Sequence, residues 1–153
     1  MNFEQKIEDV LEELEKTAGI YWNISRETAE YIYKLADAEK FANILEIGTS
    51  NGYAGMTDFI TQIKGHAPEF FERLELEKGS LDMIFVDATK AQYAQIYDAA
   101  WPFLKVGGMI VGDNIRSPFE ILEPFVNRVL SSQNAESEIV EIGTGLLISI
   151  KLN

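Results

Sequence analysis

The sequence predicts an α/β fold with a mostly parallel sheet, helices on both faces and a C-terminal antiparallel hairpin. Three short apolar runs, at residues 43–47, 81–87 and 109–111, end in glycine or polar residues and are separated by helical stretches. Such runs are typical of parallel strands that are buried on both faces. Residues 138–142 and 146–152 are joined by Gly143-Thr144-Gly145, which predicts the terminal hairpin.

Two helices are predicted ahead of the first strand, within residues 1–40. Apolar residues repeat at helical spacing from Phe3 to Thr17, and this pattern stops at Gly19. It restarts after Ser25, which is a favourable N-cap residue. We expect these helices and the core at residues 41–153 to form one domain, 1–153, because one domain of this length can bury a sizeable core.

Four further elements follow the first strand in this interpretation. Residues 59–65 alternate like a strand, and residues 68–74 predict a short helix. A longer helix is expected over residues 90–104, closed by the turn at 105–108, and another over residues 118–130.

Charge and composition favour a protein that acts on a small molecule. The 153-residue chain has a formal net charge of −12, which repels the phosphate backbone and counts against a nucleic-acid binder. The sequence has no apolar run of the roughly 20 residues that a bilayer requires, and its N-terminus lacks the order of a signal peptide. We therefore expect a cytoplasmic location and no membrane partner.

The absence of cysteine restricts the chemistry that the chain can perform. Disulfides, thiolate metal sites and cysteine nucleophiles are excluded. A metal would need oxygen ligands or the single histidine, His66, and this supply suits hard cations such as magnesium.

Glycine and polar residues follow the first predicted strand, at the edge where open parallel sheets bind ligands. Glu46 offers an acceptor there, and Gly48 and Gly52 allow the backbone to turn closely against a ligand. The spacing is not that of the dinucleotide motif G-x-G-x-x-G, which disfavours a nicotinamide cofactor. Alone, the segment is equally compatible with a plain strand-to-helix turn.

The second and third strand ends are more informative in combination. Asp87 and the pair Asp113-Asn114 would meet at one rim and offer three oxygen ligands to a hard cation. Lys90 follows three residues after Asp87, and a lysine with a lowered pKa suits a general base. An N-cap, a turn and a surface charge would explain these residues separately, but their coincidence at neighbouring strand ends favours a site.

These segments resemble those of the cation-dependent O-methyltransferases, which include the catechol and caffeoyl-coenzyme A O-methyltransferases. The similarity extends over nearly the whole chain. LEIGTSNGY at residues 45–53 resembles the family's first cofactor motif. MIFVDATKAQY at 83–93 resembles its metal-and-base segment, and LKVGGMIVGDN at 104–114 its second metal segment. The resemblance implies a Rossmann-like class I methyltransferase fold.

The resemblance also implies a role for each residue type. Asp87, Asp113 and Asn114 would hold a divalent cation, magnesium being the first choice, and Lys90 with Asp87 would be catalytic. S-adenosylmethionine would be the methyl donor, and its expected contacts are Glu46, Gly48, Ser50, Gly52, His66 and Asp87. The implied reaction is direct, metal-assisted methyl transfer to a hydroxyl of a small catechol-like or phenolic acceptor.

One departure from the family concerns the segment between Tyr53 and Ala54. About 30 to 40 residues, the length of one strand and its helices, are absent there. The strand that follows the first cofactor motif in the family, together with its ribose-binding acidic residue, is therefore missing. The few remaining residues would have to span about 17 to 20 Å back across the sheet. We infer that the protein contains further residues between Tyr53 and Ala54, or that a shortened protein places the strand predicted at residues 59–65 differently.

Other interpretations remain open at this stage. His66 stands where relatives carry an aspartate near the adenine, and it is equally compatible with a structural role. An RNA nucleoside methyltransferase shares the fold, although the acidic charge disfavours it. A non-catalytic binding or dimerisation module becomes the better interpretation if the ribose-binding block is truly absent, and homodimer formation is a further hypothesis.

Overall fold

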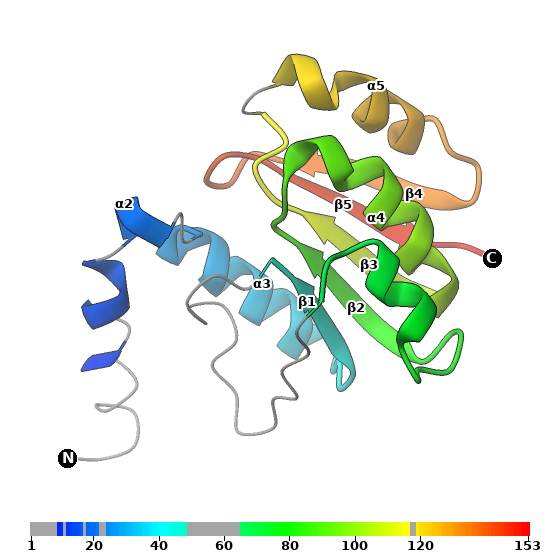
Figure 1. Ribbon diagram of the computed structural model, residues 1–153, viewed down its shortest axis with the longest axis horizontal. Coiled ribbons are helices and arrows are strands. Elements are labelled where there is room, and N and C mark those ends of the chain that lie inside the picture. Colours follow the sequence, from blue (N-terminus) through cyan, green and yellow to red (C-terminus); the bar gives the residue numbers. More distant parts are fainter. Residues whose placement is uncertain (1–8, 11, 17, 22–23, 49–64, 117–118) are drawn as a thin grey trace.

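The computed structural model describes residues 9–10, 12–16, 18–21, 24–48, 65–116 and 119–153. Its five strands form one sheet in the order β1-β2-β3-β5-β4 (Figure 1). The strands are β1 (Ile44–Ile47), β2 (Leu81–Val86), β3 (Leu104–Gly112), β4 (Ala135–Val140) and β5 (Leu146–Lys151). The first three pair in parallel, and β5 pairs antiparallel with both β3 and β4. The predicted parallel core and C-terminal hairpin are confirmed.

Helices cover both faces of the sheet, as predicted. The helix α3 (Arg26–Ala38) packs on one face, while α4 (Tyr93–Ala100) and α5 (Phe119–Leu130) cover the other (Figure 1). In β2, Met83 and Phe85 belong to the apolar cluster on the α3 side. Ile84 and Val86 belong to the cluster beneath α4 and α5. No helix in the described ranges is long and apolar enough to cross a membrane.

The N-terminal part is helical where the structure describes it. Ser25 is the N-cap of α3, as predicted, and its side chain accepts a hydrogen bond of 3.1 Å from the Thr28 amide. The first helical stretch ends before Gly19, since Lys16 is in a turn, but Gly19 itself lies inside a separate short helix, α2 (Ala18–Tyr21), that was not predicted. Glycine destabilises a helix by only about 1 kcal/mol relative to alanine, so a glycine can lie inside a helix.

The predicted helix at residues 90–104 is broken into three pieces. They are the 3-10 turn η2 (Lys90–Gln92), α4 and the 3-10 turn η3 (Trp101–Phe103). Residues 105–108, expected as a closing turn, belong to β3 instead. Pro102 has no backbone N–H and stops the α-helix, and strand pairing then begins at once, because Leu104 pairs with Leu81.

Two other predictions concern the connection between β1 and β2. The short helix expected at 68–74 is present as a 3-10 helix, η1 (Glu69–Arg73). Residues 59–64 of the predicted strand lie outside the described residues, and Gly65 is not in a strand. The Tyr53–Ala54 junction is also outside them, so the proposed missing block stays a prediction.

Asp82 joins the beginning of β1 to β2 and β3. Its Oδ2 atom accepts hydrogen bonds from the amides of Ala42 and Asn43, at 2.9 and 2.8 Å. Lys105 forms an ion pair with the same carboxylate. Burial acts to raise the pKa of Asp82, but these hydrogen bonds outweigh it and hold the pKa below the ordinary value. The interaction anchors β1, whose other end reaches the candidate site.

We expect Asp82→Ala to lower the free energy of unfolding by about 2 to 3 kcal/mol at pH 7, because three donors lose a charged acceptor. The folded-state pKa of Asp82 is lowered, so its contribution is present above pH 3.8 and disappears as the pH falls below that value. Urea denaturation at pH 7 and pH 3 measures the difference in the free energy of unfolding between the wild type and Asp82→Ala. Asp98→Ala, which removes an exposed ion pair with Arg128, should cost less than about 1 kcal/mol. An Asp82→Ala deficit that is equal at both pH values would contradict the prediction.

Candidate active site at the carboxyl ends of the parallel strands

The carboxyl ends of β1, β2 and β3 are joined into one rim by backbone hydrogen bonds. The Asp87 amide donates to the Ile47 carbonyl at 2.9 Å, and the Asp113 amide donates to the Val86 carbonyl at 2.9 Å. Each bond continues the parallel ladder by one residue beyond a strand end. The residues that follow the three strands are therefore held next to one another, as expected for a parallel sheet.

Gly48 lies against the backbone of Asp87 at this rim. Its φ angle is +103°, and a Cβ atom added there would lie 1.7 Å from the Asp87 carbonyl oxygen. Only glycine fits such a position, both for its backbone angle and for this contact. The residue that follows β1 therefore packs directly on the backbone of the segment that carries Asp87 and Lys90.

The Lys90 ammonium lies between the second and third strand ends. Its Nζ atom donates to Asn114 Oδ1 at 2.9 Å, and it lies 3.5 Å from Asp87 Oδ1 and 3.4 Å from the Asp113 carbonyl. The side chains of Lys90 and Asp87 are 17% and 20% exposed, so the pair is largely shielded from solvent. The structure thus brings together the residues that the sequence predicted at separate strand ends.

Tyr93 contacts the Lys90 ammonium through both its hydroxyl and its ring. Its hydroxyl accepts a hydrogen bond of 2.9 Å from Lys90 Nζ and donates to the Asp113 carbonyl at 2.7 Å. The ring is buried, and the ammonium lies 4.7 Å from its centroid. A cation near an aromatic face is favoured electrostatically, so Tyr93 restrains the lysine in two ways.

The corner after β3 is held by side-chain hydrogen bonds. Asn114 has a φ angle of +53°, which asparagine tolerates better than most residues. Its amide nitrogen donates to Asp113 Oδ2 at 3.0 Å and to Thr144 Oγ1 at 2.5 Å. Its backbone amide donates to Asp113 Oδ1 at 2.6 Å. Asp113 is buried, so this network satisfies a carboxylate that has little access to water.

Burial dominates the electrostatics of the rim and disfavours the charged forms of its side chains. Burial raises the pKa of Asp87 above its usual range in spite of the neighbouring Lys90. Burial also raises the pKa of Asp113, and the charge of Asp87 adds to that effect. The pKa of Lys90 is lowered, chiefly by burial, and the two carboxylates only partly oppose the change. A further cation at the rim would stabilise both carboxylates in their ionised form.

The donor set suits a hard divalent cation. Asp87, Asp113 and Asn114 supply only oxygen side-chain ligands, and the Lys90 ammonium already contacts oxygens of Asp87 and Asn114. Within the described ranges, no three histidine, cysteine, aspartate or glutamate side chains gather as a metal cluster. The candidate set therefore depends on the Asn114 amide oxygen, and water would complete the coordination.

The other residues predicted to contact S-adenosylmethionine are only partly described by the structure. Ser50 and Gly52 lie outside the described residues, while Glu46 is partly buried in β1. His66 is exposed, with its Nδ1 atom 2.7 Å from Glu69 Oε2 and its Nε2 atom 3.3 Å from the Gln92 side chain. Gln92 belongs to η2, so His66 lies near the Lys90 segment.

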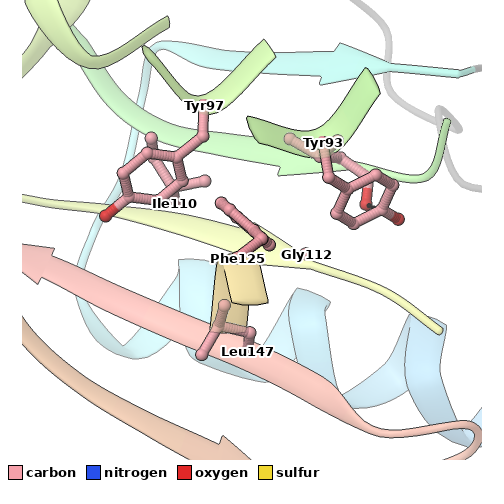
Figure 2. A pocket seen from close by; sticks show the side chains of 7 residues that line it. Tyr93, Tyr97, Ile110, Gly112, Phe125 and Leu147 are labelled. Atoms are coloured by element: carbon pink, nitrogen blue, oxygen red, sulfur yellow. Dashed lines mark hydrogen bonds between the residues drawn. The ribbon is translucent and has the colours of Figure 1, made fainter. Parts of the chain in front are cut away.

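A small cavity lies between the sheet and the α4–α5 layer, with Tyr93 and Gly112 in its walls. Figure 2 shows its aromatic and aliphatic walls. Its volume of about 10 Å³ is near the minimum for one water molecule, far below the several hundred Å³ of a ligand pocket. We interpret it as a packing gap. The lining residues are Val86, Tyr93, Tyr97, Ile110, Gly112, Phe125 and Leu147.

Tyr93 and Thr144 belong to the site but were not predicted from the sequence. Tyr93 follows Lys90 by three residues, and this spacing places side chains on one helical face, so the signal was present. Thr144 appeared only as part of a hairpin turn, and it is 30 residues away from Asn114 in the sequence. Only the packing of the hairpin brings Thr144 to the rim.

Comparisons with solved structures agree with this fold. A candidate caffeoyl-CoA O-methyltransferase from Staphylococcus aureus is 24% identical, with a TM-score of 0.78 over 92% of this chain and 91% of that chain. The O-methyltransferase TomG from Streptomyces achromogenes, in complex with S-adenosylmethionine, is 16% identical, with a TM-score of 0.79 over 94% and 89%. An O-methyltransferase from Bacillus cereus, in complex with S-adenosylhomocysteine, is 17% identical, with a TM-score of 0.77 over 94% and 91%. At these identities the likeness shows a shared fold.

The sequence itself gives the family. No curated protein matches the chain. Residues 6–115, however, match the profile of the family described as a methyltransferase domain, and this match includes the ends of β1, β2 and β3. The matched residues thus carry Gly48, Asp87, Lys90 and Asn114 of the rim. The chain belongs to the methyltransferase domain family.

Proposed function

We propose that this protein transfers a methyl group from S-adenosylmethionine to a hydroxyl of a small catechol-like or phenolic acceptor, assisted by a divalent cation. The main support is the meeting of Lys90 with Asp87 and Asn114 at the ends of β2 and β3. Two of the similar structures, TomG and the Bacillus cereus protein, are O-methyltransferases in complex with S-adenosylmethionine or S-adenosylhomocysteine. The family match and these ligands favour the same methyl donor here.

The proposed chemistry needs two groups from solution. S-adenosylmethionine would supply the sulfonium methyl, and a cation, preferably magnesium, would lower the pKa of the acceptor hydroxyl. Asp87, Asp113 and Asn114 are the side chains that would hold the cation. Gly48, where any side chain would collide with Asp87, keeps the end of β1 close to Asp87.

Lys90 would remove the proton of the acceptor hydroxyl. Burial lowers its pKa, which increases the neutral fraction that can accept a proton at Nζ. Tyr93 and Asn114 hold the same atom at the rim, so the base is positioned before the acceptor arrives. The methyl group would then be transferred to the acceptor oxygen directly, with S-adenosylhomocysteine as the leaving group and no covalent bond to the protein. The lack of cysteine is compatible with this route.

Methyl transfer to catechol should depend on added metal. After treatment with EDTA, we expect the full chain to transfer the methyl group at least about 100-fold more slowly than with magnesium, because the cation supplies several kcal/mol of charge stabilisation. Mass spectrometry of the methylated product measures the rate, and phenol is tested beside catechol. Equal rates with and without metal would contradict metal assistance. Transfer to RNA but not to either small acceptor would assign the protein to another substrate class.

Binding of S-adenosylmethionine separates an enzyme from a binding module. We expect the donor to bind in the presence of magnesium and to be converted to S-adenosylhomocysteine when an acceptor is added. Binding without turnover on any hydroxyl acceptor would favour a non-catalytic member of the fold. Gel filtration with light scattering would test homodimer formation separately.

A further inference from the structure

The side-chain amide of Asn114 has distinct environments at its two ends. Its nitrogen faces two acceptors, Thr144 Oγ1 at 2.5 Å and Asp113 Oδ2 at 3.0 Å. Its oxygen accepts from Lys90 Nζ at 2.9 Å. Rotation of the amide by half a turn would place the oxygen against the Asp113 carboxylate and the nitrogen against an ammonium. The surrounding groups therefore favour one orientation, with the oxygen toward the proposed cation.

The Thr144 hydroxyl connects the two residues of this corner. It accepts the hydrogen bond from Asn114, and its own proton is directed to Asp113 Oδ1 at 3.4 Å. A hydroxyl has one donor and two acceptor positions, so both interactions can exist together. Thr144 thus contacts both ligand candidates that follow β3.

The turn that carries Thr144 is itself anchored at several points. The Arg116 amide donates to the Thr144 carbonyl at 3.2 Å, and Arg116 also forms an ion pair with Glu141. On the other side, Gly143 packs against the N-terminus of α3, where an added Cβ atom would lie 2.5 Å from Thr28 Oγ1. The hydroxyl of Thr144 is therefore presented by a restrained turn between β4 and β5.

We propose that Thr144 is a positioning residue for the cation site, because its hydroxyl holds the Asn114 amide with the oxygen toward Lys90. This inference rests on the proposed function, since it needs Asp87, Asp113 and Asn114 to bind a cation. Because 30 residues separate Thr144 from Asn114, the predicted metal segments did not indicate this role. It acts through Asn114 and contacts no reacting group.

Titration of the full chain with manganese(II), followed by calorimetry in the absence of any methyl donor, tests the inference. Thr144→Val removes the hydroxyl but keeps the shape of the side chain, and we expect it to weaken manganese binding by about 10- to 100-fold. Thr144→Ser retains the hydroxyl and should restore binding to near the wild-type value. Circular dichroism of both variants establishes that the fold is kept.

Ser131→Ala is the control for the loss of a hydroxyl away from the rim. Ser131 is exposed at the end of α5, and its hydroxyl donates to backbone carbonyls of that helix, so this variant should bind manganese as the wild type does. Wild-type affinity in folded Thr144→Val would overturn the role of Thr144 but leave the cation site standing. Equal losses in Thr144→Val and Thr144→Ser would also overturn it, since the hydroxyl would then not be the active group. No manganese binding by the wild type would overturn the cation site together with this inference.

Discussion

Lys90→Ala is expected to lower the single-turnover rate of methyl transfer by about 10²- to 10⁴-fold, the usual contribution of a general base. The dissociation constant of S-adenosylmethionine should stay nearly unchanged, because Lys90 is directed to the acceptor proton and not to the adenosyl group. Rapid-quench measurement of the rate, with calorimetry for donor binding, gives the two quantities separately. The interaction lost would then be one that is made only during the reaction.

The same variant has an expected effect on metal binding. The Lys90 ammonium contacts the Asp87 and Asn114 oxygens that we assign to the cation, so the two positive groups repel each other. Manganese should therefore bind Lys90→Ala at least as tightly as it binds the wild type. Asp87→Ala, in contrast, should weaken metal binding and lower the rate together.

Lys34→Ala is a suitable control for the loss of charge. Lys34 is exposed on α3 and pairs only with Glu30 in the described contacts, so its removal should leave the rate and both affinities unaltered. An undiminished rate in Lys90→Ala would mean that the cation alone activates the hydroxyl. Lys90 would then be a structural charge that neutralises Asp87 in the absence of metal.

The sequence was sufficient to predict the parts of the site that depend on strand ends. Asp87 and Asn114 are far apart in the chain, but each follows an apolar strand, and parallel strands place their carboxyl ends at one edge. Lys90 could be added because three residues separate it from Asp87. The corresponding fold predictions were also local, such as the Ser25 cap and the hairpin predicted over residues 138–152.

Contacts that depend on tertiary packing could not be predicted in this way. Thr144 reaches Asn114 only because β5 pairs with β3 and the turn before it bends over the strand end. The break at Trp101–Phe103 has a local cause in Pro102, but the extension of β3 to Leu104 requires the partner strand β2. His66 is another example, since its contact with Gln92 depends on where the chain returns after residues 49–64.

Gly48→Ala is expected to destabilise the protein more than an ordinary glycine substitution. A backbone angle of +103° strains alanine by about 1 to 3 kcal/mol, and the new Cβ atom would also lie 1.7 Å from the Asp87 carbonyl oxygen. The added atom cannot be accommodated by a side-chain rotation, because the group that it meets is backbone. The chain must separate β1 from the Asp87 segment at the rim, which also disturbs the proposed donor and cation sites.

Gly79→Ala allows the two causes to be separated. Gly79 also has a positive φ angle, +74°, but an added Cβ atom has no neighbour within 4 Å, so only the backbone strain remains. Denaturant unfolding should show a loss of about 1 to 3 kcal/mol for Gly79→Ala and a loss at least about 2 kcal/mol larger for Gly48→Ala. S-adenosylmethionine binding should be retained in the first variant and lost in the second. Equal losses of stability in the two variants, with donor binding kept in both, would contradict this prediction. The contact between Gly48 and Asp87 would then neither restrain the rim nor be needed for binding of the donor.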